Sequence, residues 1–233
     1  MSSSAGAYSL GFATALGASA LAYVLLKQKE KDAAPAKPVP VRLAAGKTIF
    51  LLCDVQERFR TTIHAMPHVI ATAKTLLACA DVMSVPVVVT EQYPKALLHT
   101  VEELDVSKAK VFEKTLFSMC TDQVMAHLET LEGRDTVVLF GVEAHVCMQQ
   151  TALDLLARGY AVNVVADGAS SSRPNERTTA LERMRQAGVY ITTAESVMFE
   201  LLRSKDAAQF KQISGLAKSH GDAYKSLAEP KLT

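Results

Sequence analysis

Three residues with complementary chemistry follow three apolar segments that are far apart in the sequence. Asp54 comes directly after residues 48–53, Lys114 follows 110–112, and Cys147 follows 136–140 by way of the turn GVEAHVC. A thiol beside a carboxylate and an ammonium group forms a nucleophilic site if the three side chains meet. Cys147 stands where a helix is predicted to begin, and the start of a helix favours a thiolate.

Each group has a defined role in such a site. We expect Asp54 to take the thiol proton and Lys114 to hold the carboxylate and stabilise the thiolate or a developing oxyanion. Backbone N–H groups of Glu143 and Cys147 are candidates for the oxyanion hole. Taken singly, each side chain also has an ordinary structural role, namely a small packed residue, a turn residue and a solvated charge. Only their common position favours catalysis over these roles.

That common position depends on an alternation of strands and helices. The apolar runs predict strands at 48–53, 86–89, 110–112, 136–140, 160–165 and 189–191. Helical spacing and end signals predict helices at 67–83, 121–131, 146–157, 175–187, 194–202 and 207–217. The pattern predicts one doubly wound α/β domain over 47–204, a six-stranded parallel sheet with helices on both faces. Ligands bind at the carboxyl ends of such strands, where the three residues lie.

The two ends of the chain have a different character. Residues 1–26 carry no charge, and 7–26 form an apolar stretch of about 20 residues, enough to cross a bilayer. Lys27, Lys29 and Lys31 follow, so residues 1–31 predict a signal anchor with the domain facing the cytosol. The modest apolarity favours the mitochondrial outer membrane. Residues 32–46 are a Pro/Ala linker, and 205–233 are a C-terminal helix and tail that we expect to fray from about 218.

Composition limits the partners. The net charge is +1, and no basic stripe with interleaved aromatics is present, so we expect no nucleic-acid partner. The four cysteines contain no C-x-x-C pair, which indicates a reducing compartment and gives no zinc motif.

Three segments carry a resemblance to a known family. LLCDVQERF, EKTLFSM and GVEAHVCMQQTALDLLARGY resemble the isochorismatase-like hydrolases from about residue 47 to 202, most closely the eukaryotic isochorismatase domain-containing proteins. The resemblance implies a three-layer sandwich, an Asp–Lys–Cys triad at Asp54, Lys114 and Cys147, and cleavage of a small amide or related C–N bond through a thioester. It also implies a homo-oligomer and a cis peptide between Val142 and Glu143 that aims the Glu143 N–H into the oxyanion hole.

Four further residues are candidates for binding the substrate. Phe59 matches an aromatic that stacks on substrate in related enzymes, and Gln56 matches a position near that pocket. Tyr93 and Phe117 are placed to line the pocket mouth. Packing in the core is the alternative role for the aromatic residues.

The chain also departs from its relatives. Nicotinamidases place metal-binding Asp and His residues after the second strand, where this chain keeps only Glu91 and His99. We therefore expect no metal and no cofactor. His145 is adjacent to the nucleophile but is not expected to face it. Cys53 is expected to point to the opposite side of its strand from Asp54.

The function hypothesis is a membrane-anchored, metal-independent cysteine hydrolase of a small molecule. Two alternatives remain open at this point. One is a non-catalytic, membrane-tethered interaction module on the same fold. The other is a redox-active thiol at Cys147, for which no resolving cysteine is evident nearby in the sequence.

Overall fold

The computed structural model describes residues 42–227, which belong to one compact unit. The predicted anchor at 7–26 and residues 32–41 of the predicted linker lie outside the described residues. The prediction of a linker is wrong for Leu43, which is fully buried in the core and donates its N–H to Glu200. Within residues 42–227 no helix is both long enough and apolar enough to cross a bilayer.

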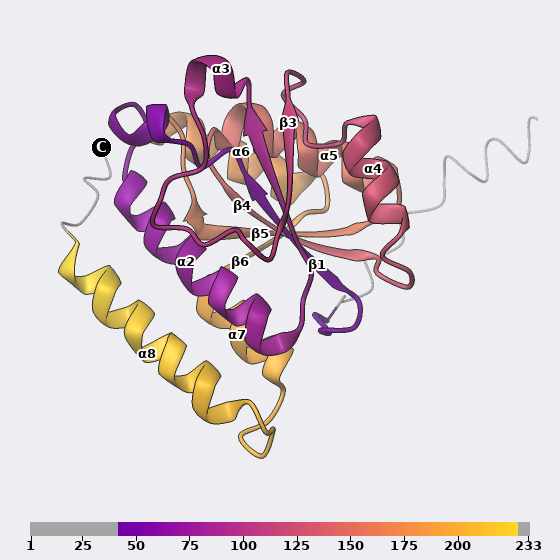
Figure 1. The fold of residues 1–233 in the computed structure, drawn as a ribbon, viewed down its shortest axis with the longest axis vertical. Coiled ribbons are helices and arrows are strands. Elements are labelled where there is room, and N and C mark those ends of the chain that lie inside the picture. Colours follow the sequence, from indigo (N-terminus) through magenta and orange to yellow (C-terminus); the bar gives the residue numbers. More distant parts are fainter. Residues whose placement is uncertain (1–41, 228–233) are drawn as a thin grey trace, which may run out of the picture. The chain divides into compact units, whose positions relative to one another are not determined.

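The described residues form the predicted six-stranded parallel sheet, in the order β3-β2-β1-β4-β5-β6 (Figure 1). The strands are β1 (Thr48–Cys53), β2 (Val87–Gln92), β3 (Lys110–Lys114), β4 (Thr136–Gly141), β5 (Ala161–Ala169) and β6 (Tyr190–Thr192). Every residue of β1 and β4 is buried, which explains why both read as continuous apolar runs instead of alternating ones. The strand order reverses direction between β1 and β4, the place where open α/β sheets bind ligands.

Helices cover both faces of the sheet. One face carries α2 (Met66–Met83), α7 (Ala194–Leu202) and α8 (Phe210–Ser226), and the other carries α4 (Asp122–Glu129), α5 (Gln149–Ala157) and α6 (Pro174–Gln186). Thr121 caps α4 as the sequence predicts, since its side chain accepts a hydrogen bond from the Val124 N–H. The sequence did not predict the short segments η1 (Glu57–Thr61) and α3 (Pro94–Leu97).

The prediction of fraying from residue 218 is wrong for much of that segment. Helix α8 continues to Ser226 because it packs along α2. Ile213 and Ala217 enter the core on that face, and the buried His220 reaches Thr75 of α2. Apolar contacts of this kind stabilise a helix whose own residues are mostly polar.

Candidate active site

The three candidate catalytic residues lie at the carboxyl edge of the sheet. Asp54 follows β1, Lys114 ends β3, and Cys147 lies in the short π-helix η2 (Ala144–Met148) that leads from β4 into α5. Their exposed fractions are 1%, 4% and 5%. The structure therefore brings together residues that are 33 to 93 positions apart in the sequence, in a nearly closed site. Their catalytic roles stay a prediction.

Lys114 is held by an unusual number of acceptors. Its Nζ donates to Asp54 Oδ2 at 2.7 Å, Gln92 Oε1 at 2.7 Å, Phe117 O at 2.9 Å and Leu116 O at 3.2 Å. Burial acts to lower the pKa of this ammonium group, but the negative charge available at Cys53, Asp54 and Cys147 outweighs it and the pKa is raised. Lys114 is therefore a fixed cation beside the thiol.

The Asp54 carboxylate is shared between two strands. Its Oδ2 pairs with Lys114, and its Oδ1 accepts a hydrogen bond from Thr90 Oγ1 of β2 at 2.8 Å. Thr90 and Gln92 stand two positions apart on β2, so they face the same side of the sheet and together orient the ion pair. Sequence reasoning missed both residues. The feature of the sequence that could have identified them is the presence of polar residues at the end of a buried strand.

The expected orientation of Cys53 relative to Asp54 is wrong. Cys53 is fully buried on the face of α5, as core packing predicts, yet its Sγ lies 3.5 Å from Asp54 Oδ2. Asp54 has a φ of +53°, and this left-handed conformation ends the alternation of the strand. The pKa of the Cys53 thiol is raised, chiefly by burial. A hydrogen bond with Cys147 and the negative charge of Asp54 raise it further. A second thiol thus lies between the carboxylate and the proposed nucleophile.

The turn before Cys147 is also built differently from the prediction. The described residues contain no cis peptide bond, so the Val142–Glu143 bond is trans. The chain reverses instead through positive φ angles at Gly141 (+143°) and Glu143 (+53°). A Cβ on Gly141 would lie 2.1 Å from the carbonyl oxygen of Cys53. Glycine is required here because β1 passes too close for any side chain.

The rest of the turn is tied to the loop after β5. The Ala144 N–H donates to Ser170 O at 2.9 Å, and the Glu143 carboxylate lies 3.2 Å from His145 Nδ1. Within the described residues the Glu143 N–H has no hydrogen-bond partner, which suits the proposed oxyanion hole. His145 Nδ1 also contacts Ser171 Oγ at 3.2 Å and thus faces away from the nucleophile.

A threonine of the third motif that was not predicted as a site residue holds the backbone of the nucleophile. Thr151 Oγ1 of α5 donates to the carbonyl oxygen of Cys147 at 2.6 Å and accepts the Met119 N–H at 2.8 Å. This contact joins the start of α5 to the loop that follows Lys114. Thr151 therefore helps to hold the two sides of the site in register.

The candidate substrate residues divide into three cases. The amide of Gln56 is buried and used by the backbone, since it donates to Gln92 O and Leu98 O and accepts the Gln92 N–H. Its role in binding substrate stays a prediction that these hydrogen bonds do not favour. Phe59 packs against the core on the α2 face. Tyr93 and Phe117 are about half exposed, at 50% and 51%.

Tyr93 helps to line a cavity of about 290 Å³ that includes Lys114. Asp54 and Cys147 do not line this cavity, and the side chain of Lys114 is fully buried. The role of Tyr93 at the pocket mouth stays a prediction.

Glu91 and His99, the residues that this chain keeps at the position of the nicotinamidase metal ligands, contact each other. Glu91 accepts hydrogen bonds from the Thr100 N–H and Oγ1, and its Oε2 lies 2.8 Å from His99 Nδ1. Between residues 42 and 227 no group of three or more His, Cys, Asp or Glu side chains is placed to hold a metal ion. The absence of a metal stays a prediction.

Comparison with known proteins adds a family assignment to this geometry. The isochorismatase domain model matches residues 48–196. The isochorismatase domain-containing protein 1 of Salmo salar is 47% identical over 178 residues, which cover 76% of this chain and 63% of that protein. The chain therefore spans less than two thirds of the length of this curated relative.

Solved structures show the same fold. The MAR1 ribonuclease from Caenorhabditis elegans superposes with a TM-score of 0.75 at 37% identity, covering 83% of this chain and 97% of that chain. The YcaC gene product from Escherichia coli, described as an octameric hydrolase of unknown specificity, superposes with a TM-score of 0.74. At 22% identity over 82% of this chain and 95% of that chain, the second likeness shows the fold alone.

Proposed function

Because this chain belongs to the isochorismatase domain family, we propose that it is a cysteine-dependent hydrolase of a small amide or related C–N bond. The observation that carries the proposal is the buried Asp54–Lys114 ion pair, at 2.7 Å, beside the thiols of Cys53 and Cys147. Buried, charged groups next to a nucleophile are typical of catalytic sites.

The positions of these residues suggest the role of each one in the reaction. Asp54 accepts the thiol proton, and the Cys147 sulfur attacks the amide carbon to form a tetrahedral intermediate. Collapse of this intermediate gives a thioester and releases the amine, which carries away the proton. Water then attacks the thioester, which yields the acid and restores the thiol. The Glu143 N–H and the Lys114 charge stabilise the oxyanion in both steps.

The size of the site favours a small substrate. Asp54, Lys114 and Cys147 keep only 1%, 4% and 5% exposure, so a substrate must be small enough to enter a nearly closed site. Several solved relatives bear the name ribonuclease. A polynucleotide requires an open basic groove, and a closed site on a chain of net charge +1 does not provide one.

The test is a screen of the full chain for ammonia release from small primary amides and N-carbamoyl compounds. Cys147→Ser should abolish release, and mass spectrometry of the wild type during turnover should find an acyl adduct on Cys147. Cys79→Ser is the matched control, since Cys79 is another buried thiol but lies on the opposite face of the sheet.

The alternative is a non-catalytic interaction module. Alkylation by iodoacetamide separates it from the enzyme even before a substrate is known. Rapid modification of Cys147 that slows in Asp54→Asn and Lys114→Met supports the catalytic site. If Cys147 reacts no faster than Cys79 in the wild type, the proposal is wrong.

We also propose that the chain forms a homo-oligomer anchored to a membrane through residues 7–26. Exposed apolar side chains at Tyr93, Leu98, Leu116 and Phe117 follow β2 and β3 at the carboxyl edge of the sheet, and they are our candidates for an oligomer contact surface. Light scattering coupled to size exclusion tests the first part. Fractionation of cells that express the full chain, with and without residues 7–26, tests the second.

A further inference from the structure

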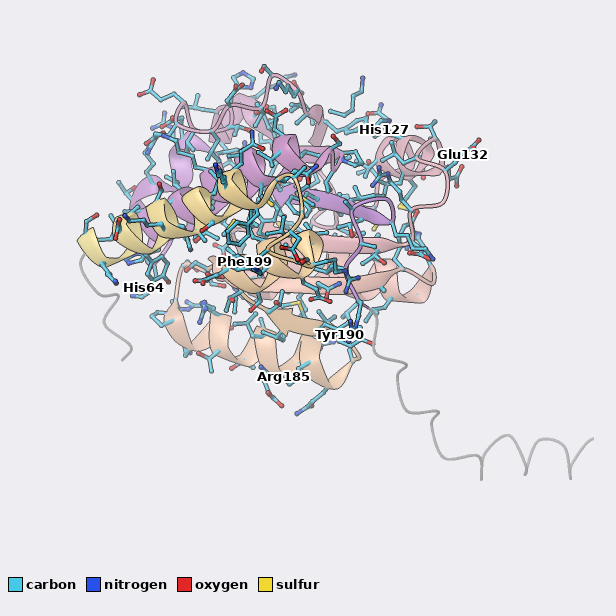
Figure 2. All side chains as sticks on the ribbon, turned by 90° about the horizontal axis from the view of Figure 1, so that it is seen from below. His64, His127, Glu132, Arg185, Tyr190 and Phe199 are labelled. Carbon is cyan, nitrogen blue, oxygen red and sulfur yellow. The ribbon has the colours of Figure 1, made fainter. Side chains whose placement is uncertain are left out.

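A second cavity is lined by residues other than the three candidate catalytic ones, although its Ser170 accepts a hydrogen bond from Ala144 in the turn before Cys147. It measures about 220 Å³ and is formed by the start of α2, the end of β5, the start of α6 and Tyr224 of α8. Asp54, Lys114 and Cys147 are not among its lining residues. Figure 2 labels His64, which contributes to this cavity near the end of α8.

One buried polar side chain in this cavity lacks a partner. His68 is 5% exposed and lines the cavity, and its Nδ1 has no hydrogen bond within the described residues. Its ring packs edge-on against Tyr224, with the ring centroids 4.6 Å apart. Proteins rarely leave a buried polar atom unpaired, and an unpaired one calls for an explanation such as an unobserved ligand.

A preoriented cation lines the same cavity. Arg177 donates from Nε to Ala169 O and from Nη2 to Ala166 O, so its guanidinium is held against the end of β5. Within the described residues its Nη1 has no hydrogen-bond partner. Burial acts to lower the pKa of Arg177, but arginine stays charged in proteins. The Nη1 group of Arg177 is therefore available to bind an anion.

The surrounding charges favour a single negative charge. Helices α2 and α6 both begin at this cavity without a side-chain cap, and helix starts favour anions. Asp167 also lines the cavity, but its Oδ1 accepts the Ala194 N–H and its Oδ2 lies 3.6 Å from His220 Nε2. Asp167 also offsets part of the Arg177 charge. Arg177 and the two helix starts then leave enough positive potential for one negative charge and not for a dianion such as phosphate.

The other residues that line the cavity determine which kind of ligand fits beside the cation. Ala65, Val69, Ala166, Pro174 and the ring of Tyr224 are apolar surfaces that surround the cation. The volume, about 220 Å³, lies below the roughly 300 Å³ at which drug-sized pockets begin. We propose that this cavity binds a small monocarboxylate with a compact apolar body, its carboxylate between Arg177 and the unpaired His68 Nδ1 and its body against the ring of Tyr224.

The proposal is independent of the chemistry at Cys147. The test is calorimetric titration of the full chain with benzoate, with benzyl alcohol as the uncharged analogue. We expect saturable one-to-one binding of benzoate and at least tenfold weaker binding of benzyl alcohol. Cys147→Ser should bind benzoate like the wild type.

Two variants locate the bound benzoate. Arg177→Gln should weaken benzoate at least tenfold, whereas Arg173→Gln, an equal loss of charge at an exposed residue on the same helix, should not. Because Arg177→Gln also removes backbone contacts, His68→Leu gives a second test that keeps the size of the side chain. The proposal is overturned if benzoate gives no saturable heat, or if its affinity survives both substitutions.

Discussion

The strongest prediction concerns Gly141, the residue that lets the nucleophile turn pass beside β1. In Gly141→Ala the new Cβ would lie 2.1 Å from Cys53 O, where real Cβ atoms essentially never come closer than 3.0 Å. The φ of +143° adds backbone strain of about 1–3 kcal/mol for a residue with a side chain. Relief of the clash separates β1 from β4 and breaks the 3.0 Å hydrogen bond from the Val142 N–H to Cys53 O, which costs about 1 kcal/mol more.

We therefore expect Gly141→Ala to lose about 3 kcal/mol or more of the free energy of unfolding, out of roughly 5–15 kcal/mol for a typical domain. Urea unfolding followed by circular dichroism measures this loss. Gly133→Ala separates the two causes, since Gly133 has a φ of +72° with open space around it and should cost only about 1–2 kcal/mol. Equal losses for the two variants would refute the argument from close approach.

Three further predictions test the ion pair and the buried histidine. Asp54→Asn and Lys114→Met should each lose about 3–5 kcal/mol, because each leaves a buried charge uncompensated, and the double variant should lose less than their sum in the same urea assay. Additive losses would contradict the coupling. Thr90→Val should cost about 1–3 kcal/mol by removing the hydrogen bond to the carboxylate, and an unchanged midpoint would contradict that role. Burial, and then the neighbouring His64, lower the pKa of His68 in the folded protein. The unfolded chain therefore takes up a proton on His68 at a higher pH than the folded protein does. The free energy of unfolding should fall as the pH drops below about 6.5, the ordinary pKa of histidine. In His68→Leu this fall should be smaller, as measured by melting temperature from pH 7 to pH 5, and an unchanged slope would contradict the assignment.

The sequence was sufficient for the fold because the pattern and the topology agree. Apolar runs such as 48–53 and 136–140 are fully buried strands, and parallel strands place their following residues at one edge. That rule places Asp54 and Lys114 at one edge of the sheet, and the strand order, with only β2 between their strands, brings them into contact. Helix ends were predictable within a few residues where a capping side chain or a glycine marks them, as at Thr121.

Details that depend on the strand register were not predictable. Gly141 is required because it pairs with Cys53 in the β1–β4 register, and nothing in the turn sequence shows this neighbour. The orientation of Cys53 toward Asp54 depends on a left-handed residue after the strand. Gln56 looked like a ligand because it is polar and near the motif, but its amide replaces backbone hydrogen bonds.

The energetics of Lys114 bear on the choice between enzyme and interaction module. Burying an ion pair is a poor way to stabilise a fold, because the desolvation of both charges offsets most of their attraction. Here the ammonium group also requires one amide and two backbone carbonyls to be turned inward toward it. Non-glycine residues with positive φ, Asp54, Tyr93 and Glu143, follow three strands at the same edge, and each such residue adds strain of about 1–3 kcal/mol. An interaction module has no use for a costly charge inside a strained, closed site, whereas a nucleophile that must become a thiolate does. The distribution of strain and buried charge therefore favours the enzyme.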